Sequence, residues 1–428
     1  MSSRTQRSMK LESGLNFVSC LKFLANGDDM VEYTRGVPEA ELKPRIAAFQ
    51  SLLDQRGVDA AIIIQKSDFF YLAGTNQQGW LYVPSQGQPL LMIFKDFSRA
   101  RAESSLERIV DLVSPKKIPA LLEEFGYRKP ATLGMELDVL PANLFFQYRS
   151  IFDKADIVDI STEIRTVRAV KSPYEIAMIR RAAAMSDRLA ARVPELLEEG
   201  KTEVCLAGEL EAYARSLGHQ GLVKMRLWGS ELFYGHLLSG ASGGVPSYLS
   251  SPTGGTGTSP ATGQGAGHRK IGRNEPILVD YVFALDGYMS DHARIFSIGK
   301  LPDDLLKAHD AMLEIQETAR REGLPGVAAG DLYEIMIAAA RDRGYADNFM
   351  GVGDRRIRFT GHGIGLELDE FPFIAKGQTL TLKPNMVIAM EPKVVLPGRG
   401  VVGIENTLIV TANGLESLSF IREDVVVV

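Results

Sequence analysis

Five side chains in the second half of the sequence place the strongest limit on how this chain folds. They are Asp280, Asp291, His362, Glu391 and Glu405, which follow one another at intervals of 11, 71, 29 and 14 residues. Each lies in, or at the end of, a segment with the apolar composition of a β-strand. A fold that brings these strand ends together gathers four carboxylates and one imidazole. Four negative charges balance two divalent cations, and this oxygen-rich ligand set suits manganese or cobalt, with zinc as an alternative. The pattern therefore predicts a two-metal hydrolase.

The first two aspartates are predicted to share one face of a hairpin. Asp280 ends an apolar strand, and Asp286-Gly287 has the composition of a two-residue turn. Such a turn sets residue 280 opposite residue 293. Because side chains alternate along a strand, Asp291 lies on the same face as residue 293 and hence as Asp280.

The other three candidates also have the surroundings of a site. Glycines surround His362 on both sides and allow close backbone approach. Glu391 follows the apolar run 386–390, and Glu405 precedes another apolar strand. Together they complete the number of ligands that two metal ions require.

Buried ion pairs are the alternative to a metal centre. An unpaired carboxylate on an apolar strand is very costly, so Asp280 needs a partner, and Arg294 or Arg358 could supply it. Each glutamate taken singly is open to the same interpretation. The prediction of a metal centre therefore depends on the five residues taken as a set.

Length and composition allow two domains after an N-terminal extension over residues 1–37. The 428 residues are 45% hydrophobic with a net charge of −5, which gives no support for nucleic-acid binding. No apolar run reaches the length of a membrane span. Two cysteines form no disulfide framework, so we expect a reducing cytoplasm. The extension is basic and then weakly apolar, but it lacks the clean cleavage site of a secretory signal.

Residues 38–165 are predicted to form an α/β domain with a parallel or mixed sheet. After a helix over 39–56, expected strands alternate with helices. The strands are expected at 60–64, 90–94, 109–113, 132–134 and 157–160.

Residues 166–428 are predicted to form an α+β domain with two similar halves. A capping box at Ser172–Glu175 starts the first helix, and Thr202 caps the second. The strands expected next lie at 222–228, 231–238, 277–283 and 288–298. Two more helices, 303–322 and 331–343, then precede strands at 357–360, 386–390 and 404–410. A site shared between the halves is a natural place for two metals.

The segment between Gly240 and Gly272 is rich in Gly, Ser, Thr and Pro. Its composition is typical of a flexible surface loop. The alternative is a lid that gates the site. Its glycines do not match a phosphate-binding pattern.

These segments resemble the pita-bread metallopeptidase family, which includes prolidase, aminopeptidase P, methionine aminopeptidase and creatinase. The resemblance covers nearly the whole chain, and the motifs that carry it are Leu278–Asp280, Gly287–Asp291, Gly361–Gly365, Met390–Pro392 and Ile404-Glu405. It implies a creatinase-like N-terminal domain followed by a pita-bread catalytic domain.

The resemblance also implies roles for the site residues. Asp280 and Asp291 would bind one metal, with Asp291, His362, Glu391 and Glu405 completing the pair. A hydroxide held between the metals would cleave an amide bond. Glu391 would double as the proton shuttle to the leaving amine. Prolidase-like relatives are commonly dimers, so a homodimer is expected.

The chain departs from the family where substrate binds. Prolidase-like members have a histidine about seven residues after the ligand histidine, where this chain has Asp369. They have another histidine some 17 residues before the first aspartate, but the region around Gly263 has none. Gly403 stands where an arginine is usual. The candidate substrate-binding residues are Asp369, Tyr288, His236 and His268.

Three functions remain open from the sequence. The first is hydrolysis of peptides as in Xaa-Pro dipeptidase or aminopeptidase P. The second is a metal-dependent hydrolase or lyase that acts on a small non-peptide, as creatinase does. The absent histidines favour it, and so does Asp369, because an acid there would attract a cationic substrate group. The third is a non-catalytic binding module, which would predict eroded metal ligands. The first two differ only in substrate, which a fold and a metal centre do not determine.

Overall fold

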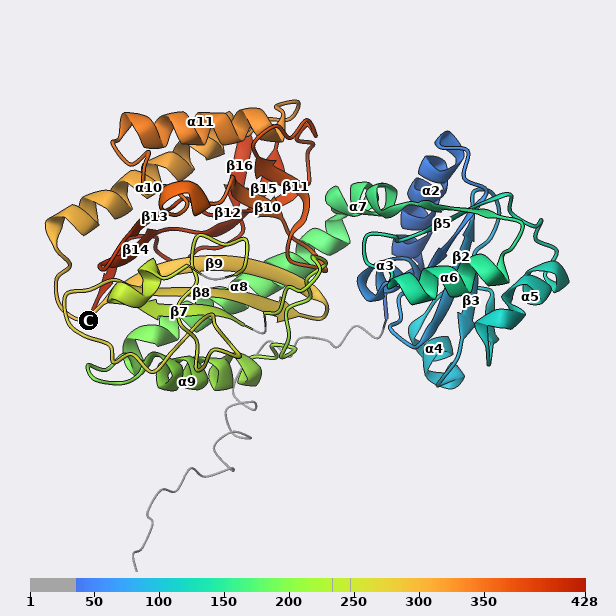
Figure 1. Ribbon diagram of the computed structural model, residues 1–428, viewed down its shortest axis with the longest axis horizontal. Coiled ribbons are helices and arrows are strands. Elements are labelled where there is room, and N and C mark those ends of the chain that lie inside the picture. Colours follow the sequence, from blue (N-terminus) through green and yellow to red (C-terminus); the bar gives the residue numbers. More distant parts are fainter. Residues whose placement is uncertain (1–35, 233, 247) are drawn as a thin grey trace, which may run out of the picture.

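The chain forms two lobes, which the computed structural model describes over residues 36–232, 234–246 and 248–428. Figure 1 shows the smaller lobe in blue to teal and the larger one in green to red. Helix α7 (Ser161–Ala169) leads from the first lobe to the long helix α8 (Pro173–Leu196) of the second. The prediction for the N-terminal extension falls almost wholly outside the described residues. Within the described ranges, no helix combines the length and the apolar character needed to cross a membrane.

The first lobe is built on a six-stranded mixed sheet. Its strand order is β4-β3-β2-β1-β5-β6, with β1 antiparallel to β2 and parallel to β5. The strands are β1 (Ala60–Ile63), β2 (Gly79–Pro84), β3 (Leu90–Ile93), β4 (Ile109–Asp111), β5 (Thr132–Met135) and β6 (Asp156–Asp159). The helices are α2 (Glu39–Gln55), α3 (Lys66–Ala73), α4 (Phe97–Glu103), α5 (Ile118–Glu124) and α6 (Ala142–Ile151). The predicted α/β sheet is confirmed, but β2 was not predicted.

The second lobe holds two larger sheets and a ribbon between two pairs of helices. Helices α8 and α9 cover one side, and α10 and α11 cover the other (Figure 1). The sheet orders are β17-β9-β8-β7 and β11-β10-β12-β15-β16, and β13 pairs with β14 as a ribbon. The helices are α9 (Glu203–Ser216), α10 (Asp303–Glu322) and α11 (Ala329–Asp342). The strands are β7 (Gly235–Ser239), β8 (Ile277–Leu285), β9 (Tyr288–Ser297), β10 (Phe359–Gly363), β11 (Glu370–Ala375), β12 (Val387–Met390), β13 (Lys393–Leu396), β14 (Gly400–Gly403), β15 (Asn406–Thr411), β16 (Gly414–Ser417) and β17 (Val426–Val427).

The order of two helices followed by strands occurs twice, as predicted for a pita-bread domain. The predicted capping box is formed, since Ser172 Oγ accepts from Glu175 N and Ser172 N donates to the Glu175 carboxylate. One predicted strand is wrong: in residues 222–228, Met225 makes an isolated bridge to Leu368 and no strand forms. The segment runs as a loop, in which Val223 is buried and Leu222 and Trp228 are exposed.

Helix α8 lies on the sheet that carries the two aspartates. Its buried face is made of small and apolar residues, among them Ile179, Ala183 and Leu189, and it packs against β8 and β9. Burial of such a stripe is what holds an amphipathic helix to a sheet. The hairpin is therefore a rigid support for its side chains.

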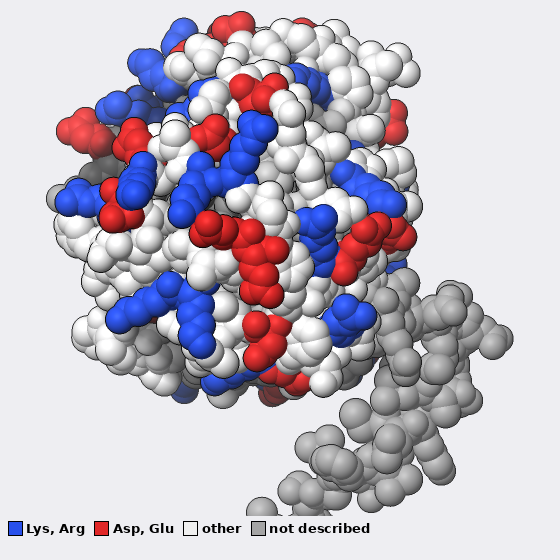
Figure 2. Space-filling model, turned by 90° about the vertical axis from the view of Figure 1, so that its right-hand side faces the viewer, with Lys and Arg blue, Asp and Glu red and all other residues white. Residues whose placement is uncertain are grey.

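A buried charged cluster connects the two lobes; we call it the junction cluster. It consists of Asp68 from the first lobe and of Arg168, Lys171, Arg226, Glu367 and Glu370. Arg168 contacts Asp68 at 2.6 Å, Glu367 at 2.8 Å and Glu370 at 2.5 Å. Over the outer face of the first lobe, by contrast, charges of both signs are interspersed (Figure 2).

Candidate metal centre

The two aspartates lie on the β8–β9 hairpin in the predicted register. Asp286 and Gly287 form its turn with φ of 51° and 90°, and Asp280 pairs with Ala293. Asp291 pairs with Val282, so the two carboxylates lie diagonally on one face. Asp291 is buried, with 4% of its surface exposed. The predicted hairpin and its register are confirmed.

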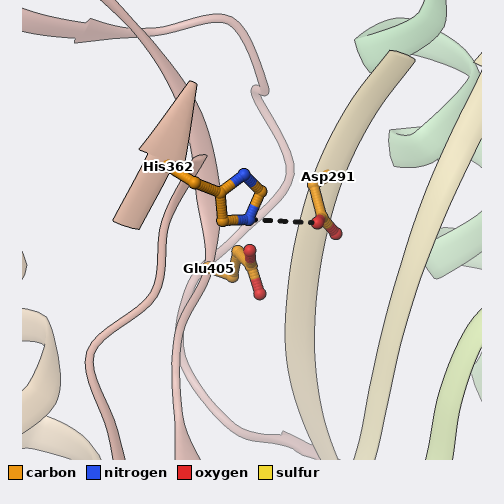
Figure 3. A group of neighbouring side chains, drawn as sticks. All are labelled: Asp291, His362 and Glu405. Atoms are coloured by element: carbon orange, nitrogen blue, oxygen red, sulfur yellow. Dashed lines mark ion pairs between the residues drawn. The ribbon is translucent and has the colours of Figure 1, made fainter. Parts of the chain in front are cut away.

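His362 and the two glutamates approach this hairpin from the second half of the lobe. His362 lies on β10, and its Nδ1 donates to Gly363 O at 3.1 Å, which leaves Nε2 free to face Asp291. Nε2 lies 4.0 Å from Asp291 Oδ2. Glu391 directly follows β12, and Glu405 directly precedes β15. Figure 3 shows Asp291, His362 and Glu405 turned toward one another.

Backbone contacts fix these ligands from behind. Ala293 and Glu405 exchange backbone hydrogen bonds, which joins the hairpin to the second half. Thr407 Oγ1 accepts from Asp291 N and contacts Asp291 O, each at 2.9 Å. Arg294 Nη1 donates to Glu405 O at 2.9 Å. Arg294 therefore supports the ligands through the backbone and does not form the ion pair with Asp280 that the sequence left open.

The ligand atoms of Asp291, His362 and Glu405 fit a divalent cation. They all lie within 4.8 Å of one another, and in the described part of the chain no other group of Asp, Glu, His or Cys meets that limit. Asp291 Oδ1 is buried and has no hydrogen-bond partner, which is costly unless a cation faces it. Burial and the neighbouring Asp280 carboxylate raise the pKa of Asp291 to about 7. Burial and the Asp291 carboxylate likewise raise the pKa of Glu405 well above its usual range. The metal centre thus holds an excess of negative charge.

Lys393 belongs to this centre and was missed by the sequence analysis. It follows Glu391 by two residues at the start of β13, and its ammonium group contacts Asp280, Glu391 and Glu405. Burial alone would lower the pKa of Lys393, but those three carboxylates together raise it well above its usual value. The signal available was a lone charged residue in the apolar run Lys393–Leu396. The ion-pair partner that Asp280 requires is therefore Lys393.

The metal centre lines a pocket that opens to solvent. All five predicted ligands line it, together with Lys393, Asp369 and His236. Met225, Leu227, Leu232, Val282, Phe359 and Leu368 provide its apolar walls. Leu249, Ser250 and Ser251 also line it, so the Gly/Ser-rich loop borders the site as the lid hypothesis expected.

His236 and Asp369 have different surroundings in this pocket. His236 Nδ1 lies 2.9 Å from Thr253 Oγ1, and its Nε2 lies 3.1 Å from Gln264 Oε1. Both partners belong to the Gly/Ser-rich loop, so His236 ties that loop to β7. Burial lowers the pKa of His236 and keeps it neutral. Asp369 points an oxygen toward His362, 3.8 Å from its Nδ1.

The structure does not bring Tyr288 or His268 to the pocket. The hydroxyl of Tyr288 contacts Arg45 at 3.0 Å and Glu175 at 3.2 Å, on the side that faces the first lobe. His268 is exposed and does not line the pocket. Alternation along β9 explains the first case, because Tyr288 and Asp291 lie three residues apart and point to opposite faces.

Two halves around a buried centre of carboxylates and one imidazole define a pita-bread metallohydrolase. Comparison with known families identifies it further. Residues 177–412 match the model of Metallopeptidase family M24, and residues 45–170 match that of the Creatinase/Prolidase N-terminal domain. The chain belongs to Metallopeptidase family M24 and is an enzyme of the metallopeptidase class.

Similar proteins span nearly the whole chain. An Xaa-Pro dipeptidase of Pyrococcus furiosus is 25% identical over 88% of this chain and 98% of its own length. A probable dipeptidase PepE of Mycobacterium bovis is 27% identical over 90% of this chain and 96% of its own. The solved structure of an Xaa-Pro dipeptidase from Bacillus anthracis is 22% identical, covers 90% of this chain and 100% of that one, and has a TM-score of 0.77. This last likeness concerns the fold.

Proposed function

We propose that this enzyme is a metal-dependent dipeptidase that hydrolyses the amide bond of Xaa-Pro dipeptides. The observation that carries the proposal is the group of Asp291, His362 and Glu405, which lies at the floor of a pocket and leaves one buried oxygen unpartnered. The named activity of the Pyrococcus furiosus relative, which matches 88% of this chain and 98% of its own length, supports the choice of substrate.

The metal ligands, Glu391, Asp369 and the apolar walls of the pocket have different roles in this reaction. Asp291, His362 and Glu405 would hold a divalent ion, which would make water a nucleophile at neutral pH and polarise the scissile carbonyl. Glu391 lines the pocket beside these ligands and passes a proton to the leaving amine. Asp369 presents a negative charge that attracts the free α-amino group of a dipeptide. The apolar walls exclude water and accommodate the proline ring.

We expect manganese or cobalt as the metal, with zinc as the alternative, because the ligands are oxygens and a single nitrogen. The four carboxylates taken alone match the two ions predicted from the sequence. Lys393, which that ligand count omitted, changes the balance of charge.

A small cationic non-peptide is the second candidate substrate. Asp369 favours it, because its carboxylate lines the pocket at the position where the family has a histidine. Such a histidine would donate to the substrate carbonyl, and one donor of this kind is worth about 10²–10³ in rate. An acid in its place attracts a cation and donates nothing while ionised.

Release of free proline tests the two candidates. The purified chain with Mn²⁺ is given a series of Xaa-Pro dipeptides and, separately, small cationic amides. We expect proline release, and we expect it to be lost on addition of a chelator. Release of product only from the non-peptide amides would replace the first candidate by the second.

Three further expectations stay predictions. A homodimer follows from the resemblance to prolidases and is checked by light scattering. Cytoplasmic location is checked by fractionation. The domain boundary between residues 165 and 166 is checked by limited proteolysis.

A further inference from the structure

Lys393 is a cation that the chain itself places inside the metal centre. Its side chain is 1% exposed, and Nζ lies 2.8 Å from Asp280 Oδ2, 2.9 Å from Glu391 Oε2 and 2.5 Å from Glu405 Oε2. An ammonium group has three N–H donors, so each donor has one carboxylate as its acceptor. These carboxylates come from β8, from the end of β12 and from the start of β15. Lys393 therefore joins the same elements that a metal ion would join.

Gly403 provides the space that Lys393 uses. The two residues face each other across the β13–β14 ribbon. At Gly403, φ is +152°, and a Cβ there would lie 2.4 Å from Pro392 O and 3.0 Å from Lys393 Cγ. Lys393 Cα would lie 2.7 Å from such a Cβ, so a side chain at position 403 would clash with the backbone beside Lys393 as well as with its stem. The backbone of Gly403 therefore approaches Lys393 more closely than a residue with a side chain would allow.

The carboxylates of the centre differ in their contacts with Lys393. Asp280 Oδ2 is paired with Nζ, and Asp280 lies outside the group whose ligand atoms gather within 4.8 Å. An ion bonded to that oxygen at about 2.1 Å would lie within about 5 Å of the ammonium group, where the two cations repel each other. Asp291 and His362 have no contact with Lys393 among the ion pairs of the described residues. Glu405 contacts Nζ through Oε2, so it lies between Lys393 and these two residues. What sets Asp291, His362 and Glu405 apart is that their ligand atoms gather within 4.8 Å, whereas Asp280 is taken up by the ammonium group.

We propose that the ammonium group of Lys393 takes the place of one of the two cations, so that the chain binds a single divalent ion held by Asp291, His362 and Glu405. One divalent ion and Lys393 bring three positive charges to four carboxylates, and two ions beside Lys393 would bring five, so either count differs from four by one. The proposal therefore rests on the position of the ammonium group at Asp280, Glu391 and Glu405. The inference rests on the proposed function only in that both need a metal.

The number of bound ions tests this inference directly. The full chain is stripped of metal, titrated with Mn²⁺ by calorimetry, and dialysed for elemental analysis. Low-temperature electron paramagnetic resonance then distinguishes an isolated Mn²⁺ from a spin-coupled pair. We expect one ion per chain and the spectrum of an isolated ion. Two ions with a coupled spectrum, or none, would overturn the proposal.

Lys393→Ala removes both the charge and the bulk, and we expect it to bind two ions per chain with a coupled spectrum. Lys383→Ala, at an exposed lysine, is the matched control and should bind one. If the Lys393 variant still binds one ion, Lys393 does not exclude the second, and the proposal is wrong. If that variant does not fold, the count in the unaltered chain decides alone.

These measurements use no substrate, so they separate the inference from the proposed function. A chain with one ion that releases no proline would remove the proposed function and keep the inference. An active dipeptidase with two ions would do the reverse.

Discussion

The metal centre and the junction cluster are both buried sets of charged side chains, but their charges are balanced differently. In the junction cluster, Arg168, Lys171 and Arg226 face the carboxylates of Asp68, Glu367 and Glu370. In the metal centre, four carboxylates face Lys393 and one imidazole. The first set is complete within the chain, and the second requires a cation from outside.

The balance of charge distinguishes a structural cluster from a functional one. Buried charges are tolerated when each one is paired and hydrogen-bonded, and they then contribute to one defined arrangement. A buried excess of one sign is costly to the fold and persists where a ligand offsets it. In the junction cluster, burial would raise the pKa of Glu370, but Arg168 and Lys171 together lower it to about 2. In the metal centre, the pKa of Asp291 is raised instead.

The largest expected effect comes from removing one carboxylate of the metal centre. We expect Asp291→Asn to lose metal binding and to lower kcat/KM by at least about 10³-fold, because the metal contributes several kcal/mol to the transition state. In the metal-free protein, the free energy of unfolding should stay the same or rise, because fewer carboxylates then repel one another. Asp303→Asn, at an exposed aspartate, is the control and should keep full activity. A metal-free Asp291→Asn protein that is clearly less stable than the unaltered chain would contradict the idea of excess charge.

Removing a charge from the junction cluster should do the opposite, lowering stability without changing the number of bound metal ions. Arg168→Met leaves three buried carboxylates short of a partner, and breaking a buried pair in this way costs about 3–5 kcal/mol. Denaturant unfolding of the metal-free protein measures the loss. Arg399→Met removes an exposed pair with Asp304, and we expect a much smaller loss because solvent screens that pair. Equal losses in the two variants would show that the junction cluster adds little stability.

Much of the metal centre could be predicted because short-range rules determine it. A two-residue turn sets the register of β8 and β9, and alternation then puts Asp280 and Asp291 on one face. The order of helix pairs and strands gave the repeated halves of the domain. These features depend on local composition and on neighbouring strands.

Lys393 could not be placed by the same rules. The orientation of the Lys393 side chain depends on the β13–β14 ribbon, on the space left by Gly403 and on carboxylates up to 113 residues away in sequence. Tyr288 shows the converse case, since its motif resembles part of a site but its hydroxyl contacts Arg45 and Glu175 at the junction of the lobes. The strand β2 was missed although it forms a local antiparallel hairpin with β3, in which Tyr82 pairs with Leu90.

The smallest expected effect is an acid dependence that belongs to the junction cluster. Glu370 has a pKa of about 2 in the folded chain, below its ordinary value of 4.5. A carboxylate with a lowered pKa adds stability that is complete above its unfolded pKa and is lost as the pH falls through its folded pKa. This shift corresponds to about 3 kcal/mol, lost between about pH 4.5 and pH 2. We expect the stability difference between the unaltered chain and Glu370→Gln to be largest near pH 6 and to shrink by pH 3, as measured by urea unfolding at each pH in the presence of a chelator. A difference that stays constant over this range would mean that Arg168 and Lys171 do not hold Glu370 ionised, and the contrast between the two clusters would then rest on geometry alone.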